Sequence, residues 1–119
     1  MNSILVVDDD PVYARMVREW TKDAYQAFVV VSGEQTLRFL SKHTVDLILL
    51  DYEMPEMNGP QTLAALRENP DTAGITVVFL SGAADEASLN EIRSLTTAGF
   101  IPKTTTKEAL LAKVEEILG

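Results

Sequence analysis

The chain has 119 residues, enough for one domain with a buried core and too few for two. Its hydrophobic fraction of 46% and charged fraction of 24% are ordinary for a globular protein. The longest purely apolar stretch, 27–31, is far shorter than the ~18 residues of a membrane span, and no basic segment precedes the first apolar run. The absence of cysteine excludes disulfides, thiol catalysis and thiolate metal sites. We therefore expect one domain over residues 1–119, cytoplasmic and without membrane contact.

The charge balance is acidic, because 10 Lys and Arg residues stand against 18 Asp and Glu residues and give a net charge of −8. Binding to nucleic acid depends on basic side chains that displace counterions from phosphates, so this surface repels nucleic acid. We expect no direct contact with DNA or RNA. If the protein controls DNA, it does so through another domain or a partner.

Apolar runs alternate with amphipathic stretches along the chain. The pattern predicts strands at 3–8, 26–31, 45–50, 75–80 and 99–102, and helices at 11–23, 33–42, 59–69, 84–96 and 106–118. The runs at 4–7 and 47–50 are continuously apolar, as in a parallel sheet with helices on both faces. Short right-handed crossovers then favour an α/β fold with a single doubly wound (βα)5 parallel sheet.

Local signals support these elements. Asp10 and Pro11 suit the cap and the first position of a helix, and the sequences 32–35 and 105–108 fit capping boxes. In the first helix, Val12, Met16 and Trp20 recur at helical spacing, with Tyr13 and Val17 beside them, which predicts that this stripe faces the core. Leu110, Val114 and Ile117 form a similar stripe near the end of the chain, and Pro102 suits a strand at the edge of the sheet.

Polar residues follow four of the predicted strands. Asp8, Asp9 and Asp10 come after the first strand, Asp51 after the third, Ser81 after the fourth and Lys103 after the fifth. Each has an ordinary structural explanation alone, as a cap, a strand end, a turn or a solvated lysine. Because parallel strands place their carboxyl ends at one edge, we expect all of them to converge there. Carboxylates, a hydroxyl and an ammonium group together indicate a site for a divalent cation and a phosphoryl group.

These residues occur in motifs that resemble the receiver domain of two-component response regulators, including the chemotaxis regulators. The resemblance covers essentially the whole chain, and its motifs are ILVVDD at 4–9, LLDYEMPEMNG at 49–59, FLSG at 79–82 and AGFIPK at 98–103. It implies a flavodoxin-like fold with strand order 2-1-3-4-5.

The resemblance also implies a role for each site residue. Asp51 is the expected phosphoacceptor; Mg²⁺ is the expected cofactor, bound by Asp9, Asp51 and the Glu53 backbone carbonyl, and by Asp8 mainly through water. Ser81 and Lys103 are expected to contact the phosphoryl oxygens, and Phe100 to change rotamer with Ser81 as a switch. The chain is then a phosphoacceptor rather than an enzyme, apart from self-catalysed phosphotransfer and autodephosphorylation.

The same resemblance implies the partners. The phosphoryl donor is a phosphohistidine on a histidine kinase or histidine phosphotransfer protein, and the target is a downstream effector protein or domain, with a homodimer possible on phosphorylation. The expected output face comprises the fourth helix, fifth strand and fifth helix. His43, the only histidine, is expected on the surface.

Some positions depart from the family pattern. Thr104 follows Lys103 where the family usually has proline, and we expect a trans bond there because a cis bond to a non-proline residue costs about 2.5–4 kcal/mol. Glu53 and Ala83 are expected to tune the lifetime of the phosphoryl group.

Two alternatives remain open. Residues 4–12 also fit the first motif of haloacid dehalogenase-like phosphatases, with Asp8 as nucleophile and Asp10 as general acid. That reading leaves Asp51 without a role and lacks the further acidic pair and the cap domain. The other alternative is a receiver-like module that binds a partner without being phosphorylated. The departure at Thr104 supports it, but the presence of all the site residues (Asp8, Asp9, Asp51, Ser81 and Lys103) disfavours it. No Gly-rich nucleotide-binding motif occurs.

Overall fold

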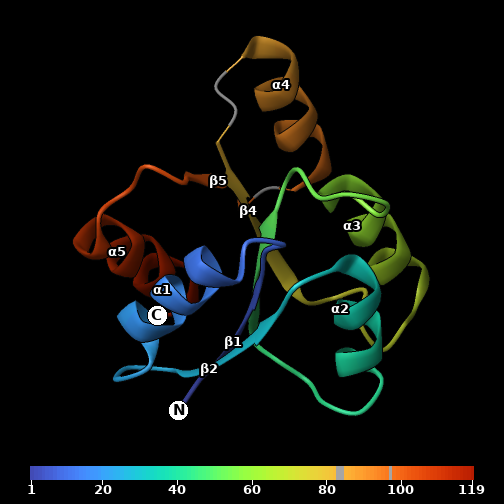
Figure 1. The fold of residues 1–119 in the computed structure, drawn as a ribbon. Helices are drawn as coiled ribbons and strands as arrows, with labels where there is room; N and C mark the ends of the chain where they lie inside the picture. The colour runs from blue at the N-terminus through green and yellow to red at the C-terminus, as the bar shows by residue number, and fades with distance from the viewer. Residues whose placement is uncertain (83–84, 97) are drawn as a thin grey trace.

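The computed structural model describes residues 1–82, 85–96 and 98–119, and Figure 1 shows its ribbon. Strands and helices alternate strictly. In chain order they are β1 (Ser3–Val7), α1 (Pro11–Thr21), β2 (Gln26–Val30), α2 (Gly33–Leu40), β3 (Leu47–Asp51), α3 (Gly59–Glu68), β4 (Thr76–Ser81), α4 (Glu86–Leu95), β5 (Phe100–Pro102) and α5 (Lys107–Leu118). Every predicted element is confirmed, with ends that agree to within two residues; position 84, where one predicted helix starts, lies outside the described residues.

The five strands form one parallel sheet in the order β2-β1-β3-β4-β5. This confirms the doubly wound fold and the strand order 2-1-3-4-5. The order places β1 and β3 side by side in the centre, so the loops that follow them open next to each other. β5 is an edge strand, where Pro102 removes a backbone donor at little cost.

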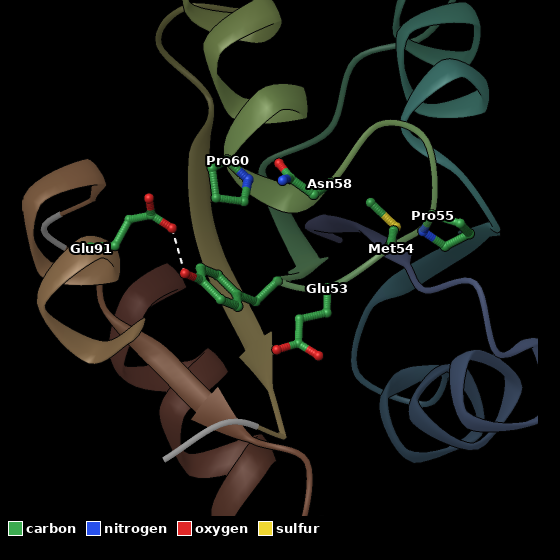
Figure 2. Close-up of a pocket in the computed structure, with 7 residues that line it drawn as sticks. Glu53, Met54, Pro55, Asn58, Pro60 and Glu91 are labelled. Carbon is green, nitrogen blue, oxygen red and sulfur yellow. Dashed lines mark hydrogen bonds between the residues drawn. The ribbon is translucent and has the colours of Figure 1, made fainter. Parts of the chain in front are cut away.

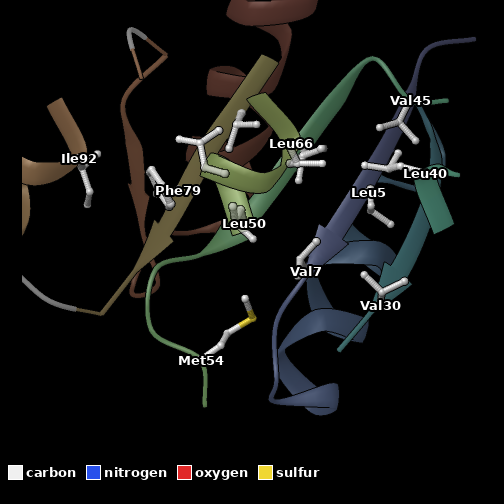
Figure 3. Close-up of a cluster of buried hydrophobic side chains, with 13 residues drawn as sticks. Leu5, Val7, Val30, Leu40, Val45, Leu50, Met54, Leu66, Phe79 and Ile92 are labelled. Atoms are coloured by element: carbon white, nitrogen blue, oxygen red, sulfur yellow. The ribbon is translucent and has the colours of Figure 1, made fainter. Parts of the chain in front are cut away.

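Two helical layers cover the sheet, with α1 and α5 on one face and α2, α3 and α4 on the other (Figure 1). Side chains of each strand alternate between the layers. Ile4, Val6, Leu47 and Leu49 pack towards α1 and α5. Leu5, Val7, Ile48 and Leu50 pack in the opposite core cluster, shown in Figure 3. All eight side chains are fully buried, which explains why these runs contain no polar residue.

The prediction of which side chains of α1 face the core is wrong in part. Val12 is 72% exposed, and the buried positions of the helix are Ala14, Val17 and Thr21. Val17 belongs to the predicted stripe, whereas Ala14 and Thr21 are small or polar, so a hydrophobic pattern alone does not reveal those two. Thr21 satisfies its hydroxyl by donating to the Val17 carbonyl at 3.0 Å.

The helix starts are mostly as expected. Asp10 caps α1, with its carboxylate accepting from the backbone N–H groups of Val12 and Tyr13. The predicted capping box at 105–108 is wrong because Thr106, not Thr105, caps α5. The box at 32–35 is only half formed, since the Gln35 side chain accepts from the N–H of Val31 instead of Ser32.

The bond between Lys103 and Thr104 is trans, as expected. His43 is exposed and lies beside the Phe39 ring, with 4.7 Å between ring centroids. Within 1–82, 85–96 and 98–119, no helix combines the length and the apolarity that crossing a bilayer requires.

Candidate functional site

The site forms where β1 and β3 end side by side. Asp8 directly follows β1 and Asp51 is the last residue of β3, and their side chains are 0% and 2% exposed. Lys103, on the loop between β5 and α5, lies between them. Its Nζ is 2.8 Å from Asp8 Oδ2 and 3.0 Å from Asp51 Oδ1. The predicted convergence of these three residues is therefore confirmed.

Asp9 completes an acidic cluster. One carboxylate oxygen from each of Asp8, Asp9 and Asp51 lies within 4.8 Å of the others, and Asp9 is exposed, so the cluster opens to solvent. Three carboxylates (−3) and the Lys103 ammonium (+1) leave a formal charge of −2. Two carboxylates about 4 Å apart repel by roughly 4 kcal/mol at an effective dielectric constant of 20. One lysine cannot offset this repulsion fully.

The ionisation of Asp51 reflects this excess of negative charge. Burial and repulsion by Asp8 raise the pKa of Asp51 from 3.8 to about 7, although Lys103 acts in the opposite direction. Burial by itself would lower the pKa of Lys103, but its contacts with Asp8 and Asp51 outweigh that effect and raise it. The lysine therefore stays charged at neutral pH, and Asp51 is held close to the point at which it takes up a proton.

Two backbone N–H groups hold the carboxylates in place. The N–H of Asp10 donates to Asp8 Oδ1 at 2.9 Å, and the N–H of Glu53 donates to Asp51 Oδ1 at 3.3 Å. Among the described residues, the buried Oδ2 atom of Asp51 has no hydrogen-bond partner. A buried oxygen without a partner is costly, so this atom needs a cation or a donor. Hard oxygen ligands near an exposed carboxylate fit Mg²⁺ better than Zn²⁺.

Ser81 and Phe100 lie on the strands next to this cluster. Ser81 ends β4, is 2% exposed, and comes one residue after Leu80, the residue that pairs with Asp51. Its carbonyl accepts from the N–H of Lys103 at 2.9 Å, so β4 fixes the loop that carries the lysine. Phe100 is half-buried and packs on the side of α2, α3 and α4. Ala83, the other residue expected near the site, lies outside the described residues.

Gly59 lets α3 begin close to Asp51. A Cβ atom at this position would lie 2.5 Å from the backbone carbonyl oxygen of Asp51 and 2.9 Å from the Phe79 ring. Both are below any normal contact distance, so only glycine fits without a shift of backbone. The helix is fixed there by a complete capping box between Asn58 and Gln61. The sequence motif at 49–59 contains this glycine but does not indicate its packing requirement.

Two tyrosines near the site were not predicted to belong to it. The Tyr13 ring lies 5.1 Å from Lys103 Nζ, and burial is the main cause that raises the pKa of its hydroxyl. The Tyr52 hydroxyl donates to Glu91 on α4, and this hydrogen bond is the main cause of its raised pKa. The position of Tyr13 in the first turn after Asp10 could have indicated its contact with the site. No sequence signal links Tyr52 to a residue 39 positions away.

The sequence profile of the response regulator receiver domain matches residues 4–115 of this chain. The chain belongs to this family. It is 34% identical over 119 residues to the transcriptional regulatory protein CpxR of Escherichia coli, covering 99% of this chain and 50% of CpxR. It is 33% identical over 118 residues to the sensor kinase CckA of Brucella abortus, covering 97% of this chain and 12% of CckA. The chain thus spans half or less of the length of these curated relatives.

A solved structure agrees with this assignment. The signal receiver domain of a histidine kinase from Syntrophus aciditrophicus superposes with a TM-score of 0.89 at 30% identity, covering 99% of this chain and 90% of that one. The chain is therefore a receiver domain of two-component signal transduction, a regulatory phosphoacceptor by family. The phosphatase alternative, which needed Asp8 as nucleophile in another family, is wrong. Receiver domains occur in kinases and in regulators with further domains, so kinase and effector partners follow in general terms.

Proposed function

We propose that Asp51 accepts a phosphoryl group from a phosphohistidine on a histidine kinase or histidine phosphotransfer protein, and that this reaction requires Mg²⁺. The observation that carries the proposal is the environment of Asp51. Its carboxylate is buried, shares Lys103 with Asp8, and has an Oδ2 atom without a hydrogen-bond partner within the described part of the chain. An acceptor oxygen with a lone pair not engaged in a hydrogen bond, in a preorganised site, is what nucleophilic attack on phosphorus requires.

The metal would be held by Asp9, Asp51 and the backbone carbonyl of Glu53, with Asp8 acting mainly through a bound water. The acidic cluster fits a divalent cation, because a charge of +2 brings the formal charge of the site from −2 to zero. Bound Mg²⁺ would supply electrostatic stabilisation of the negative charge on the transferring phosphoryl group.

In the transfer step, an oxygen of the Asp51 carboxylate attacks phosphorus as the phosphorus–nitrogen bond of the donor breaks, and the bonding electron pair stays on the imidazole. Lys103 is already within 3.0 Å of Asp51 Oδ1, so its ammonium group can pair with a phosphoryl oxygen as that group arrives. The hydroxyl of Ser81 donates to another oxygen. Asp51 exchanges one carboxylate charge for about −1.5 to −2 on the phosphoryl group.

The added charge and acceptor oxygens are the signal. They draw Ser81 and Lys103 towards Asp51, and Phe100 changes rotamer as Ser81 moves, which alters the face formed by α4, β5 and α5. This face binds a downstream effector protein or domain, or a second copy of the chain as a phosphorylation-dependent homodimer. Autodephosphorylation by water resets the switch, and Glu53 beside the site tunes its rate. We place this reaction in the cytoplasm, without direct contact with nucleic acid or membrane.

Intact-mass spectrometry tests this proposal. The chain is incubated with Mg²⁺ and acetyl phosphate, a small phosphoryl donor, in parallel with Asp51→Asn and with a control lacking magnesium. We expect one phosphoryl adduct on the wild type and none in either control. An adduct of equal yield on Asp51→Asn would overturn the assignment of the acceptor.

The absence of an adduct on the wild type has two explanations, which beryllium fluoride separates. This analogue forms a stable complex with an acceptor carboxylate and Mg²⁺, so it detects a site that loses its phosphoryl group too fast to observe. If beryllium fluoride also fails to change the NMR spectrum of folded protein, the chain is a binding module that works without phosphorylation.

A further inference from the structure

A cleft of about 400 Å³ opens beside the loop that follows Asp51, as Figure 2 shows. This volume is within the range of about 300–1,000 Å³ that is usual for ligand-binding pockets. Its lining comes from the β3–α3 loop, the start of α3 and one residue of α4: Tyr52, Glu53, Met54, Pro55, Asn58, Pro60 and Glu91. Of these residues, Glu53 alone has a role proposed above, as a metal ligand through its backbone carbonyl and in tuning autodephosphorylation; the cleft itself is not used there.

Part of the lining is apolar and rigid. Met54 is only 8% exposed and belongs to the core cluster on the side of α2 and α3, so its side chain is held in place. The rings of Pro55 and Pro60 fix the backbone on either side of the loop. The Tyr52 ring packs edge-on against Phe79, with 5.8 Å between the centroids. A ligand that binds here therefore meets a preformed surface and loses little free energy in ordering it.

The charge of the cleft has one sign. Glu53 and Glu91 are both exposed, and no basic side chain occurs among the described residues that line the cleft. In Figure 2, Glu91 projects from α4 on one side, Met54 and Pro55 lie on the opposite side, and Glu53 lies between them. An apolar floor with carboxylates at its rim is complementary to a cation carried on an apolar stem.

Glu91 is held in position for such a contact. The Tyr52 hydroxyl donates to its Oε1 atom, drawn as the dashed line in Figure 2. A carboxylate has a second oxygen, and each oxygen can accept more than one hydrogen bond. The tyrosine thus orients the carboxylate and leaves it capacity to accept from an incoming donor.

We propose that this cleft binds an arginine side chain of a partner protein, presented with an apolar residue next to it in the same segment. The guanidinium pairs with Glu91 and Glu53, and the aliphatic stem lies over the Tyr52 ring and Pro60. Arginine fits better than lysine because its planar, weakly hydrated cation makes bidentate contacts with carboxylates and stacks on aromatic rings. The apolar neighbour contacts Met54 and Pro55.

The cleft also adjoins the phosphoacceptor site. Glu53 lines the cleft with its side chain, and its backbone N–H donates to Asp51 Oδ1 at 3.3 Å. A partner segment bound here would lie next to the acceptor carboxylate. The binding itself does not rest on phosphorylation, because the cleft and its charges are present in the unmodified chain.

NMR titration of the unmodified protein tests the proposal. The probe is an acetylated and amidated pentapeptide with a central arginine between two leucines, added without Mg²⁺ or a phosphoryl donor. We expect backbone amide shifts at Tyr52, Glu53 and Glu91, with a dissociation constant on the order of 1 mM. The same peptide with citrulline, which has arginine's shape without its charge, should bind at least about fivefold more weakly.

A matched pair of variants localises the effect. Glu91→Gln removes the charge but keeps an oxygen that can accept from the Tyr52 hydroxyl, and we expect it to weaken binding about fivefold. Glu86→Gln makes the same charge change on the same helix outside the cleft lining, and we expect less than a twofold effect. Thermal unfolding of both variants checks that the fold is kept.

Three outcomes would overturn the proposal: equal affinity for the arginine and citrulline peptides, equal losses in the two variants, or shifts absent from the cleft at 10-fold the expected dissociation constant. Because the titration contains neither Mg²⁺ nor a phosphoryl donor, these outcomes leave the phosphoacceptor assignment of Asp51 untouched. The acetyl phosphate reaction fails or succeeds separately.

Discussion

Asp51 ends β3, and α4 follows the neighbouring strand β4, but the two regions are held in place by different forces. Asp51 is 2% exposed and takes part in an ion pair with Lys103, which also binds the fully buried Asp8. In α4 only Ile92 is buried, and Leu95 is 37% exposed. The first region is held by buried charges. The helix α4 buries Ile92 and is joined to its neighbours by hydrogen bonds from Tyr52 to Glu91 and from Thr96, its C-cap residue, to the Val77 carbonyl oxygen. Regions with few buried apolar contacts open most readily.

This difference bears on how a receiver domain can respond to a small chemical change. Adjacent strand residues point to opposite faces of the sheet. Asp51 accordingly contacts Lys103, on the loop that leads to α5, whereas Tyr52 packs with the α2, α3 and α4 layer and donates to Glu91. A displacement of the strand end therefore acts on both regions at once. Of the two regions, we expect α4 to yield more readily, because Ile92 is its one fully buried side chain.

The largest effect should come from removing the shared cation. Lys103→Met leaves Asp8 and Asp51 buried without an opposite charge, and we expect the free energy of unfolding at pH 8 without metal to fall by about 3–5 kcal/mol. Chemical denaturation measures it. Lys22→Met is the matched control, since Lys22 forms an exposed, solvent-screened pair with Glu19 and its loss should change stability far less. Similar losses in both variants would show that the site region is not held by buried charge.

A second prediction concerns pH. The pKa of Asp51 is raised in the folded state from 3.8 to about 7, so its protonated form stabilises the fold, and that stabilisation is lost as pH rises through 7. In EDTA, the melting temperature of the wild type should fall between pH 5 and pH 8 relative to Asp51→Asn. At pH 8 we expect Asp51→Asn to be the more stable by about 1–4 kcal/mol, of the order of one carboxylate repulsion.

Melting curves of the two proteins across this range provide the check. Adding Mg²⁺ at pH 8 should raise the melting temperature of the wild type and narrow its difference from Asp51→Asn. Parallel curves at every pH would contradict the raised pKa.

Gly59→Ala should disturb the site region through packing alone. The added Cβ lies 2.5 Å from the Asp51 carbonyl oxygen, so the start of α3 or the end of β3 must move, and we expect a loss of about 1–3 kcal/mol. Gly74→Ala is the control, because nothing lies within 4 Å of a Cβ at that position. Denaturant unfolding compares them, and a neutral Gly59→Ala would mean that the close approach of α3 is not required.

The smallest effect should appear in α4. Tyr52→Phe removes the donor to Glu91, and we expect a global loss of only about 0.5–1.5 kcal/mol. In hydrogen exchange, Tyr52→Phe should nevertheless lower the protection of the α4 backbone amides relative to the wild type, and lower it more than that of the α1 amides. Tyr25→Phe, a matched loss of a hydroxyl from a half-buried tyrosine near the opposite end of the sheet, should leave α4 unchanged. Equal exchange from α4 in both variants would refute the attachment through Tyr52.

Much of the fold and of the site follows from local sequence pattern. The apolar runs at 4–7 and 47–50 specify central strands because both faces are covered, and the residues after them must then meet at one edge. This was sufficient to predict that Asp8, Asp51 and Lys103 come together. The strand order needed the family resemblance, since periodicity does not say which strands pair.

Sequence pattern did not predict features that depend on how closely elements approach each other or on contacts between residues far apart in the chain. Val12 is apolar yet 72% exposed, because small residues such as Ala14 allow α1 to lie close to the sheet on another face. The bond between Tyr52 and Glu91 joins residues 39 positions apart, and polar side chains at that separation carry no periodic signal. No local pattern reveals why position 59 is glycine, namely that the Asp51 carbonyl oxygen and the Phe79 ring lie too close for a Cβ atom.

The most direct test of the account identifies the residue that carries the phosphoryl group. Borohydride reduces an aspartyl phosphate to homoserine, so treatment of the chain after reaction with Mg²⁺ and acetyl phosphate marks the acceptor for peptide mapping by tandem mass spectrometry. We predict homoserine at the position of Asp51 alone, and none when magnesium is omitted. Homoserine at the position of Asp8 or Asp9, with Asp51 unmodified, would contradict the account.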